Sequence, residues 1–232
     1  KFVTEKKLFK EIKNEITDWQ GFLDELWAAS SVFNLMLVGN EDGWRDLGIK
    51  NFSKIFKSIS AIRFMNVSQC YVLFLSILRN YKKLGTDPLR TFNIIEKFTF
   101  NYSAVCKMPG NKVERIYSRY ATLIEEIILT ETDKKIPGKV QSILSSLEKE
   151  LKNERPGIEY FSDQFMDVKY KLSSNGISFI KYVLSEINNV KEKTDEYKLD
   201  FNNVNIEHLL PQKPDPEWNL KRADIKDYVN LI

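Results

Sequence analysis

The residue best suited to acid–base chemistry is His208, the only histidine among 232 residues. It follows Glu207 and stands three residues before Pro211. Val204 and Ile206 alternate with polar neighbours, as in a short β-strand, so His208 is expected at the end of that strand. A neutral imidazole with a pKa of about 6.5 can take a proton from water at neutral pH. The segment is therefore suited to hydrolysis. Without further context, a polar histidine at a strand end remains the alternative.

The acid–His–x–x–Pro arrangement resembles the first motif of HNH nucleases, the ββα-metal or His-Me finger group. The wider stretch resembles the start of the nuclease domain of GmrSD-type restriction enzymes. It comprises Ile206–Pro211, then Trp218, then a helix ending in the sequence Tyr-Val-Asn-Leu-Ile at 228–232. Enzymes of that type are modification-dependent DNA endonucleases. They join an N-terminal ParB-like nucleotide-hydrolysing domain to a C-terminal HNH domain. The helical sequence in front of the motif, including 113–121, adds to the resemblance.

The resemblance implies that His208 is the general base and that Glu207 helps to bind Mg²⁺ or Mn²⁺. It also implies a DNA substrate, modified DNA included, and a role in restriction and phage defence. Adjacent residues of a strand point to opposite faces, so Glu207 can share the site only at a bend. An exposed or structural carboxylate is the alternative for Glu207. For Trp218 we expect a place in the core.

In the family, a residue like Ile232 leads into a Gly-Asn-Leu segment and further metal-site residues. The chain begins at Lys1 without a methionine and stops at Ile232. We therefore expect an internal fragment that is inactive alone and binds no cofactor, with the remaining metal ligands beyond Ile232. Nucleotide would be bound by a domain absent from this chain. The expected parts are a helical domain at 1–190, a charged linker at 191–198, and the truncated start of an HNH-like nuclease domain at 199–232.

Composition points to a mainly α protein with a sizeable core. The chain is 43% hydrophobic and has only 9 glycines and 7 prolines, few for a sandwich or barrel. A net charge of +3 does not by itself indicate a nucleic-acid-binding protein. Cys70 and Cys106 lie far apart in apolar stretches, so we expect buried free thiols in a reducing compartment, although a disulfide stays open. The longest apolar run, 70–78, is about half a membrane span, which favours a cytoplasmic protein without membrane contact.

Apolar residues at helical spacing predict eight or nine helices. The expected helices lie at about 4–16, 18–38, 52–64, 67–84, 88–106, 111–129, 137–153, 162–170 and 177–190. The segment 39–43 contains two glycines and is expected to be a loop. The segment 67–84 is the most apolar and is expected at the centre. The segment 18–38 has apolar residues dense enough for burial on more than one side. The predicted fold class is thus a multi-helix domain followed by a truncated ββα-type segment.

Lys112, Arg115 and Arg119 share one face of the helix expected at 111–129, opposite its apolar stripe. Beside several tyrosines, this basic stripe could contact DNA phosphates. The alternative is the solvated face of an ordinary amphipathic helix. A competing hypothesis for the whole chain is an all-helical interaction or DNA-contacting spacer module, in which His208 has no catalytic role. The sequence does not determine the oligomeric state.

Overall fold

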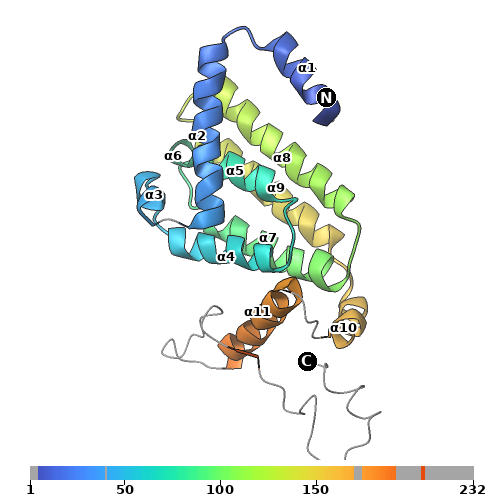
Figure 1. The fold of residues 1–232 in the computed structure, drawn as a ribbon. Coiled ribbons are helices and arrows are strands. Elements are labelled where there is room, and N and C mark those ends of the chain that lie inside the picture. The colour runs from blue at the N-terminus through green and yellow to red at the C-terminus, as the bar shows by residue number, and fades with distance from the viewer. Residues whose placement is uncertain (1–4, 40, 170–173, 192–204, 207–232) are drawn as a thin grey trace, which may run out of the picture.

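The computed structural model describes residues 5–39, 41–169, 174–191 and 205–206. This part of the chain is mainly helical, as predicted (Figure 1). Its elements are α1 Glu5–Glu15, α2 Trp19–Val38, α3 Glu41–Asp46, α4 Phe52–Phe64, α5 Tyr71–Arg79, α6 Tyr81–Leu84, α7 Leu89–Thr99, the π-helix η1 Phe100–Val105, α8 Gly110–Thr130, α9 Ile136–Glu154, α10 Ile158–Met166 and α11 Ser174–Lys191. The predicted ββα-type segment falls almost wholly outside the described residues and stays a prediction.

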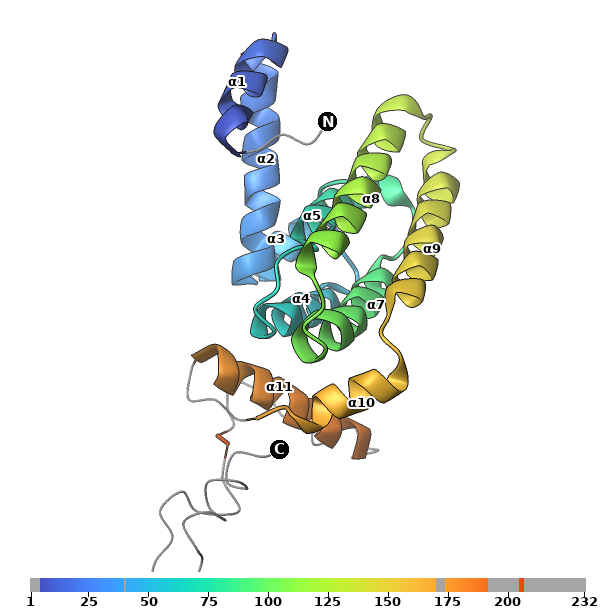
Figure 2. The same ribbon diagram turned by 90° about the vertical axis from the view of Figure 1, so that its right-hand side faces the viewer.

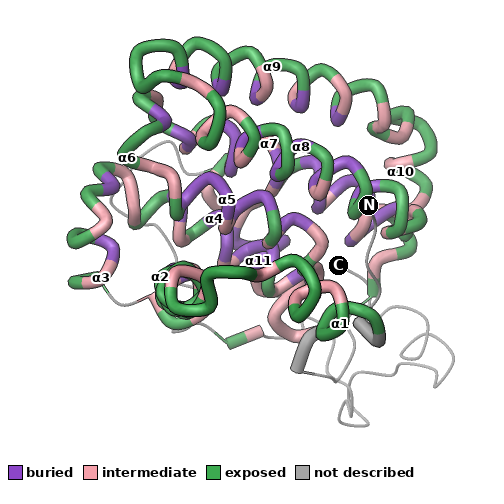
Figure 3. Tube along the Cα trace, turned by 90° about the horizontal axis from the view of Figure 1, so that it is seen from above, coloured by how far each residue is buried: buried purple, intermediate pink, exposed green. Residues whose placement is uncertain are grey.

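Helix α5 is the centre of the bundle, which confirms the expectation for this segment. It packs against α8 and α2, while α4 packs on α7, and α9 covers α8, α7 and α6. Leu73, Phe74 and Ile77 of α5 have no exposed surface. The Phe74 ring stacks on Phe92 of α7 with centroids 4.1 Å apart. In Figure 3 the buried residues concentrate on α5, α7 and α8, and the outer helices are exposed along their outer sides.

The segment expected as one helix at 67–84 is two helices, α5 and α6, separated at Asn80. The Asn80 side chain donates hydrogen bonds to the Ser76 carbonyl at 2.9 Å and to Glu125 of α8 at 3.0 Å. Its backbone leaves the helical region, with φ −99° and ψ 6°. Asparagine side chains compete with the hydrogen bonds of a helix in this way. Here the bond to Glu125, which is distant in the sequence, stabilises the interruption between α5 and α6. Gly85 closes α6 in the left-handed conformation, φ 62°, as expected for a glycine after a helix.

The loop predicted at 39–43 is wrong at 41–43, because Glu41–Asp46 forms α3. Gly39 ends α2 with φ 76°, and its N–H donates to the Leu35 carbonyl at 3.0 Å. Trp44 of α3 is fully buried and meets the Phe56 ring edge-on at 6.3 Å. The burial of Trp44 contributes more to packing than Gly43 costs in helix propensity, so tertiary contacts overrode the local signal.

Two other helix limits differ from the sequence expectation. The helix predicted at 88–106 changes at Phe100 into η1, where the Cys106 N–H donates to the Asn101 carbonyl at 3.1 Å, a five-residue spacing. The helix predicted to begin at 162 begins at Ile158, so Ser162 lies inside α10 and donates to the Ile158 carbonyl at 2.9 Å. Cys70 and Cys106 are buried and unpaired, which confirms free thiols. Among the described residues, no helix has the length and apolarity that crossing a membrane requires.

Candidate functional site

The predicted catalytic residue His208 and the predicted metal ligand Glu207 both lie outside the described residues. The description reaches their neighbours Asn205, which is exposed, and Ile206, which is half-buried. The proposed roles of His208 and Glu207 therefore stay predictions. Within the described ranges, no three His, Cys, Asp or Glu side chains gather as a metal site would require.

The three residues of the basic stripe do share an exposed face of α8, but two of them are paired with α9. The Lys112 ammonium lies 2.5 Å from Glu154, and the Arg119 guanidinium donates to Glu150 at 2.6 Å. Arg115 is exposed and forms no ion pair with any described residue. The hydrogen bond that Lys112 donates to Glu154 raises the pKa of Lys112, because the carboxylate stabilises the ammonium. Of the stripe, Arg115 is thus the side chain whose charge no described carboxylate offsets.

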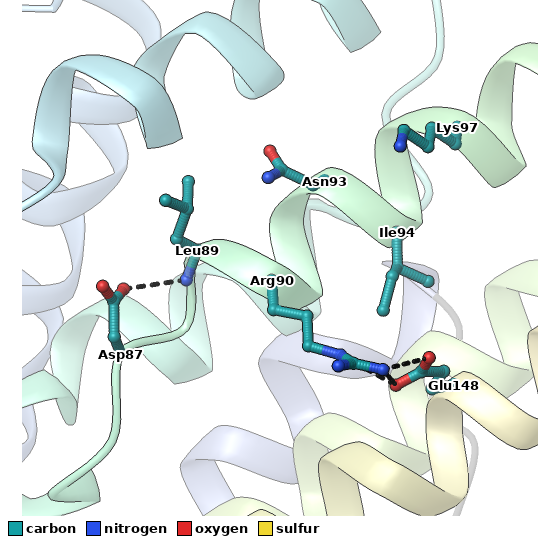
Figure 4. Close-up of a pocket in the computed structure, with 7 residues that line it drawn as sticks. All are labelled: Asp87, Leu89, Arg90, Asn93, Ile94, Lys97 and Glu148. Carbon is teal, nitrogen blue, oxygen red and sulfur yellow. Dashed lines mark hydrogen bonds and ion pairs between the residues drawn. The ribbon is translucent and has the colours of Figure 1, made fainter.

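A third ion pair of the same kind ties α9 to α7. Arg90 donates to both oxygens of Glu148, at 2.7 and 2.9 Å (Figure 4). Glutamates at 148, 150 and 154 of α9 therefore each meet a cation from α7 or α8. Exposed pairs of this type contribute little to stability, because water and salt screen the attraction between the charges. Their main consequence for function is that they lower the positive potential along this side of the bundle.

A shallow groove of about 520 Å³ lies beside the Arg90–Glu148 pair. Its lining is Asp87, Leu89, Arg90, Asn93, Ile94, Lys97 and Glu148 (Figure 4). The Asp87 carboxylate is already engaged, because it accepts from the Leu89 N–H at 3.0 Å. Glu148 is engaged by Arg90. No nucleophile stands next to a base here, so the groove lacks the arrangement that covalent or acid–base catalysis needs.

The C-terminal helices meet the rest of the bundle through five aromatic side chains, here called the junction cluster: Phe100 of η1, Phe161 and Phe165 of α10, Phe179 and Tyr182 of α11. The Phe100 ring lies at the middle, with centroid distances between 5.8 and 6.2 Å to the other four rings. This cluster was not predicted from the sequence. The available signal was the pair of phenylalanines at 161 and 165, which one helical turn brings together.

Residues 155–232 match the model of the family described as GmrSD restriction endonucleases, C-terminal domain. The resemblance inferred from the 206–232 motif is thereby confirmed. No match was found among curated proteins or among solved structures. The matched range begins at residue 155, so it contains α10 and α11 as well as Glu207 and His208.

The region that matches this family begins with α10 and α11, which are docked on the helical body, a name used here for residues 5–154. Figures 1 and 2 show α10 and α11 lying across the end of the body where α4, α7 and η1 come together. The Tyr182 hydroxyl donates to Glu96 of α7 at 3.0 Å, and Lys57 of α4 lies 3.2 Å from Glu186. Burial, reinforced by the Glu96 carboxylate, raises the pKa of Tyr182. Aromatic packing and polar contacts thus hold the described start of the matched region against the helical body.

Proposed function

We propose that this chain forms part of a restriction-type DNA endonuclease in which His208 is the general base. The observation that carries the proposal is the family match, because its range includes the Glu207-His208-x-x-Pro211 motif. The family description also supports DNA as the substrate. Histidine is the side chain whose ordinary pKa permits proton uptake near pH 7. His208 is the only histidine in the printed sequence, so no other imidazole of this chain competes for the role.

In the proposed reaction, the His208 imidazole accepts a proton from a water molecule. The resulting hydroxide attacks the scissile phosphorus in line, and the bond between phosphorus and the leaving oxygen breaks. Glu207 would contribute a carboxylate ligand for Mg²⁺ or Mn²⁺, together with residues outside the described part. Such an ion, when bound, stabilises the negative charge that grows on the phosphate.

For the helical body we propose the role of a rigid mount. A catalytic side chain must be held within a fraction of an ångström, which buried helices achieve better than a flexible tether. The junction cluster supports this role, because it joins the body to the first helices of the GmrSD domain. A second candidate, an interaction or spacer module without catalysis, draws support from the exposed apolar side chains of α1 and α2.

The test is His208→Ala in the full-length protein, with cleavage of modified and unmodified DNA as the readout. Loss of a positioned general base should lower the cleavage rate about 10²–10⁴-fold. Gln212→Ala is the matched control, since it alters the same segment without removing the imidazole. Retained nucleotide hydrolysis and an unchanged circular dichroism spectrum would show that the variant is folded. Unchanged cleavage on every substrate would refute the role of His208 and favour the spacer module.

A further inference from the structure

Helix α2 is apolar on two faces, but the structure covers only one of them. Val32 and Met36 are buried against the body. On the other side, Leu23 and Leu26 are about half exposed, and Trp27 is 78% exposed. A helix that is apolar all round is ordinarily buried all round. The expected burial on more than one side is therefore not found among the described residues, which leave the second face of α2 exposed.

Helix α1 carries a matching apolar stripe. Leu8 is 49% exposed and Phe9 is 75% exposed. Figure 1 shows α1 and the N-terminal half of α2 joined at their near ends and splayed apart, at the opposite end of the molecule from α10 and α11. Among the described residues, α1 makes no extensive contact with another helix. Two amphipathic helices splayed in this way complete a four-helix bundle when a second such pair packs against them.

We propose that α1 and α2 pair with α1 and α2 of a second copy of this chain, with α1 of each copy lying on α2 of the other. The charges of the two helices set this arrangement. Helix α2 has two acids, Asp24 and Glu25, and no base, whereas α1 has four lysines against three glutamates. Packing α2 directly on its symmetry mate would bring acids together. Packing α1 on the partner's α2 brings exposed lysines such as Lys10 and Lys13 towards acids.

The exposed area is large enough for such a dimer. Six exposed apolar side chains of α1 and α2 would lie in the proposed interface: Leu8, Phe9, Trp19, Leu23, Leu26 and Trp27. Since an aromatic side chain buries about 150–250 Å², the six would remove on the order of 600–700 Å² per copy. Two copies together then reach roughly 1,200–1,400 Å², within the range of specific interfaces.

The first test is sedimentation equilibrium of the 232-residue chain over a range of micromolar concentrations. The expected result is a concentration-dependent species of twice the 27.2 kDa chain mass. Trp27→Glu should raise the dimer dissociation constant at least about 30-fold, because it places a charge where an aromatic anchor packs. Leu129→Glu is the matched control: Leu129 is 83% exposed on α8, outside the proposed interface, and should leave the mass unchanged.

The second test examines the arrangement. Zero-length lysine–carboxylate crosslinking of mixed ¹⁴N and ¹⁵N chains should link Lys10 or Lys13 of one copy to Asp24 or Glu25 of the other. A monomer at all concentrations would overturn the proposal and leave the face to a different protein. A dimer that survives Trp27→Glu, or whose crosslinks join other faces, would also overturn it. Neither measurement involves DNA cleavage, so the result is independent of the proposed function.

Discussion

Helices α5 and α2 are both strongly apolar, but their surroundings differ. α5 is enclosed by α8, α2 and the Phe92 side of α7, and Leu73 has no exposed surface. α2 lies at the edge of the bundle and buries only Val32 and Met36 among its twenty residues. Apolar composition therefore correctly indicated which helices have apolar faces that favour burial. It did not indicate whether such a face is buried by other helices of the same chain or by a partner.

The difference between α5 and α2 also distinguishes side chains that stabilise the fold from side chains that can stabilise an interface. A side chain buried within its own chain contributes to the free energy of folding. A side chain exposed on a second apolar face contributes to stability only when a partner binds and buries it. Residues of α5 and α2 with the same chemistry should therefore respond to the same substitution in different assays.

Leu73→Ala should lower the free energy of unfolding by about 2–5 kcal/mol, because it leaves a cavity in the central helix. Leu23→Ala removes the same atoms from α2, where the side chain is 52% exposed. Its cost should be under about 1 kcal/mol at a concentration where the chain is monomeric. Urea unfolding followed by circular dichroism measures both. Equal losses for the two leucines would show that α2 is as much a part of the core as α5.

The junction cluster is intermediate between the buried core around α5 and the exposed face of α2. Its central ring, Phe100, is partly buried by α10 and α11. Phe100→Ala should cost about 1–3 kcal/mol, less than a fully buried phenylalanine, since Phe100 is half-buried. The substitution should weaken the packing of α10 and α11 on the helical body, so limited proteolysis near Arg155–Gly157 should become faster. Phe9→Ala, a change of the same size on exposed α1, is the control. An unchanged proteolysis rate at 155–157 would mean that Phe100 does not hold the junction.

Tyr182 makes docking sensitive to high pH. Its pKa is raised in the folded chain, so its neutral form stabilises the fold below the unfolded pKa of about 10, and this contribution falls as pH rises above that value. Tyr182→Phe should cost about 1 kcal/mol at pH 7, through the lost bond to Glu96. The variant should also lose less stability than the wild type between pH 9 and 11. Parallel pH profiles for the two proteins would contradict this assignment.

The sequence predicted most helices but not the features that depend on distant partners. The start of α2 followed from Asp18, whose carboxylate accepts the Gly21 N–H at 3.0 Å, a purely local contact. The break at Asn80 depends on Glu125, and the helical state of α3 depends on burial of Trp44. Neither partner is visible in a local window of sequence. The same limit applied to the candidate site: the His208 motif was recognisable locally, whereas the junction cluster assembles from three separate helices.

The smallest predicted effects concern the basic stripe, where Arg115 and Arg119 differ only in their partners. Arg119→Ala should change stability by no more than about 1 kcal/mol, because its pair with Glu150 is exposed. If the stripe contacts DNA phosphates, Arg115→Ala should reduce the slope of log affinity against log salt by about 0.9, the value for one lost phosphate contact. Arg119→Ala should reduce that slope less, since Glu150 already neutralises the guanidinium. Fluorescence anisotropy with a short duplex at several salt concentrations measures both slopes. Identical slopes for the wild type and Arg115→Ala would assign the stripe to the solvated face of α8.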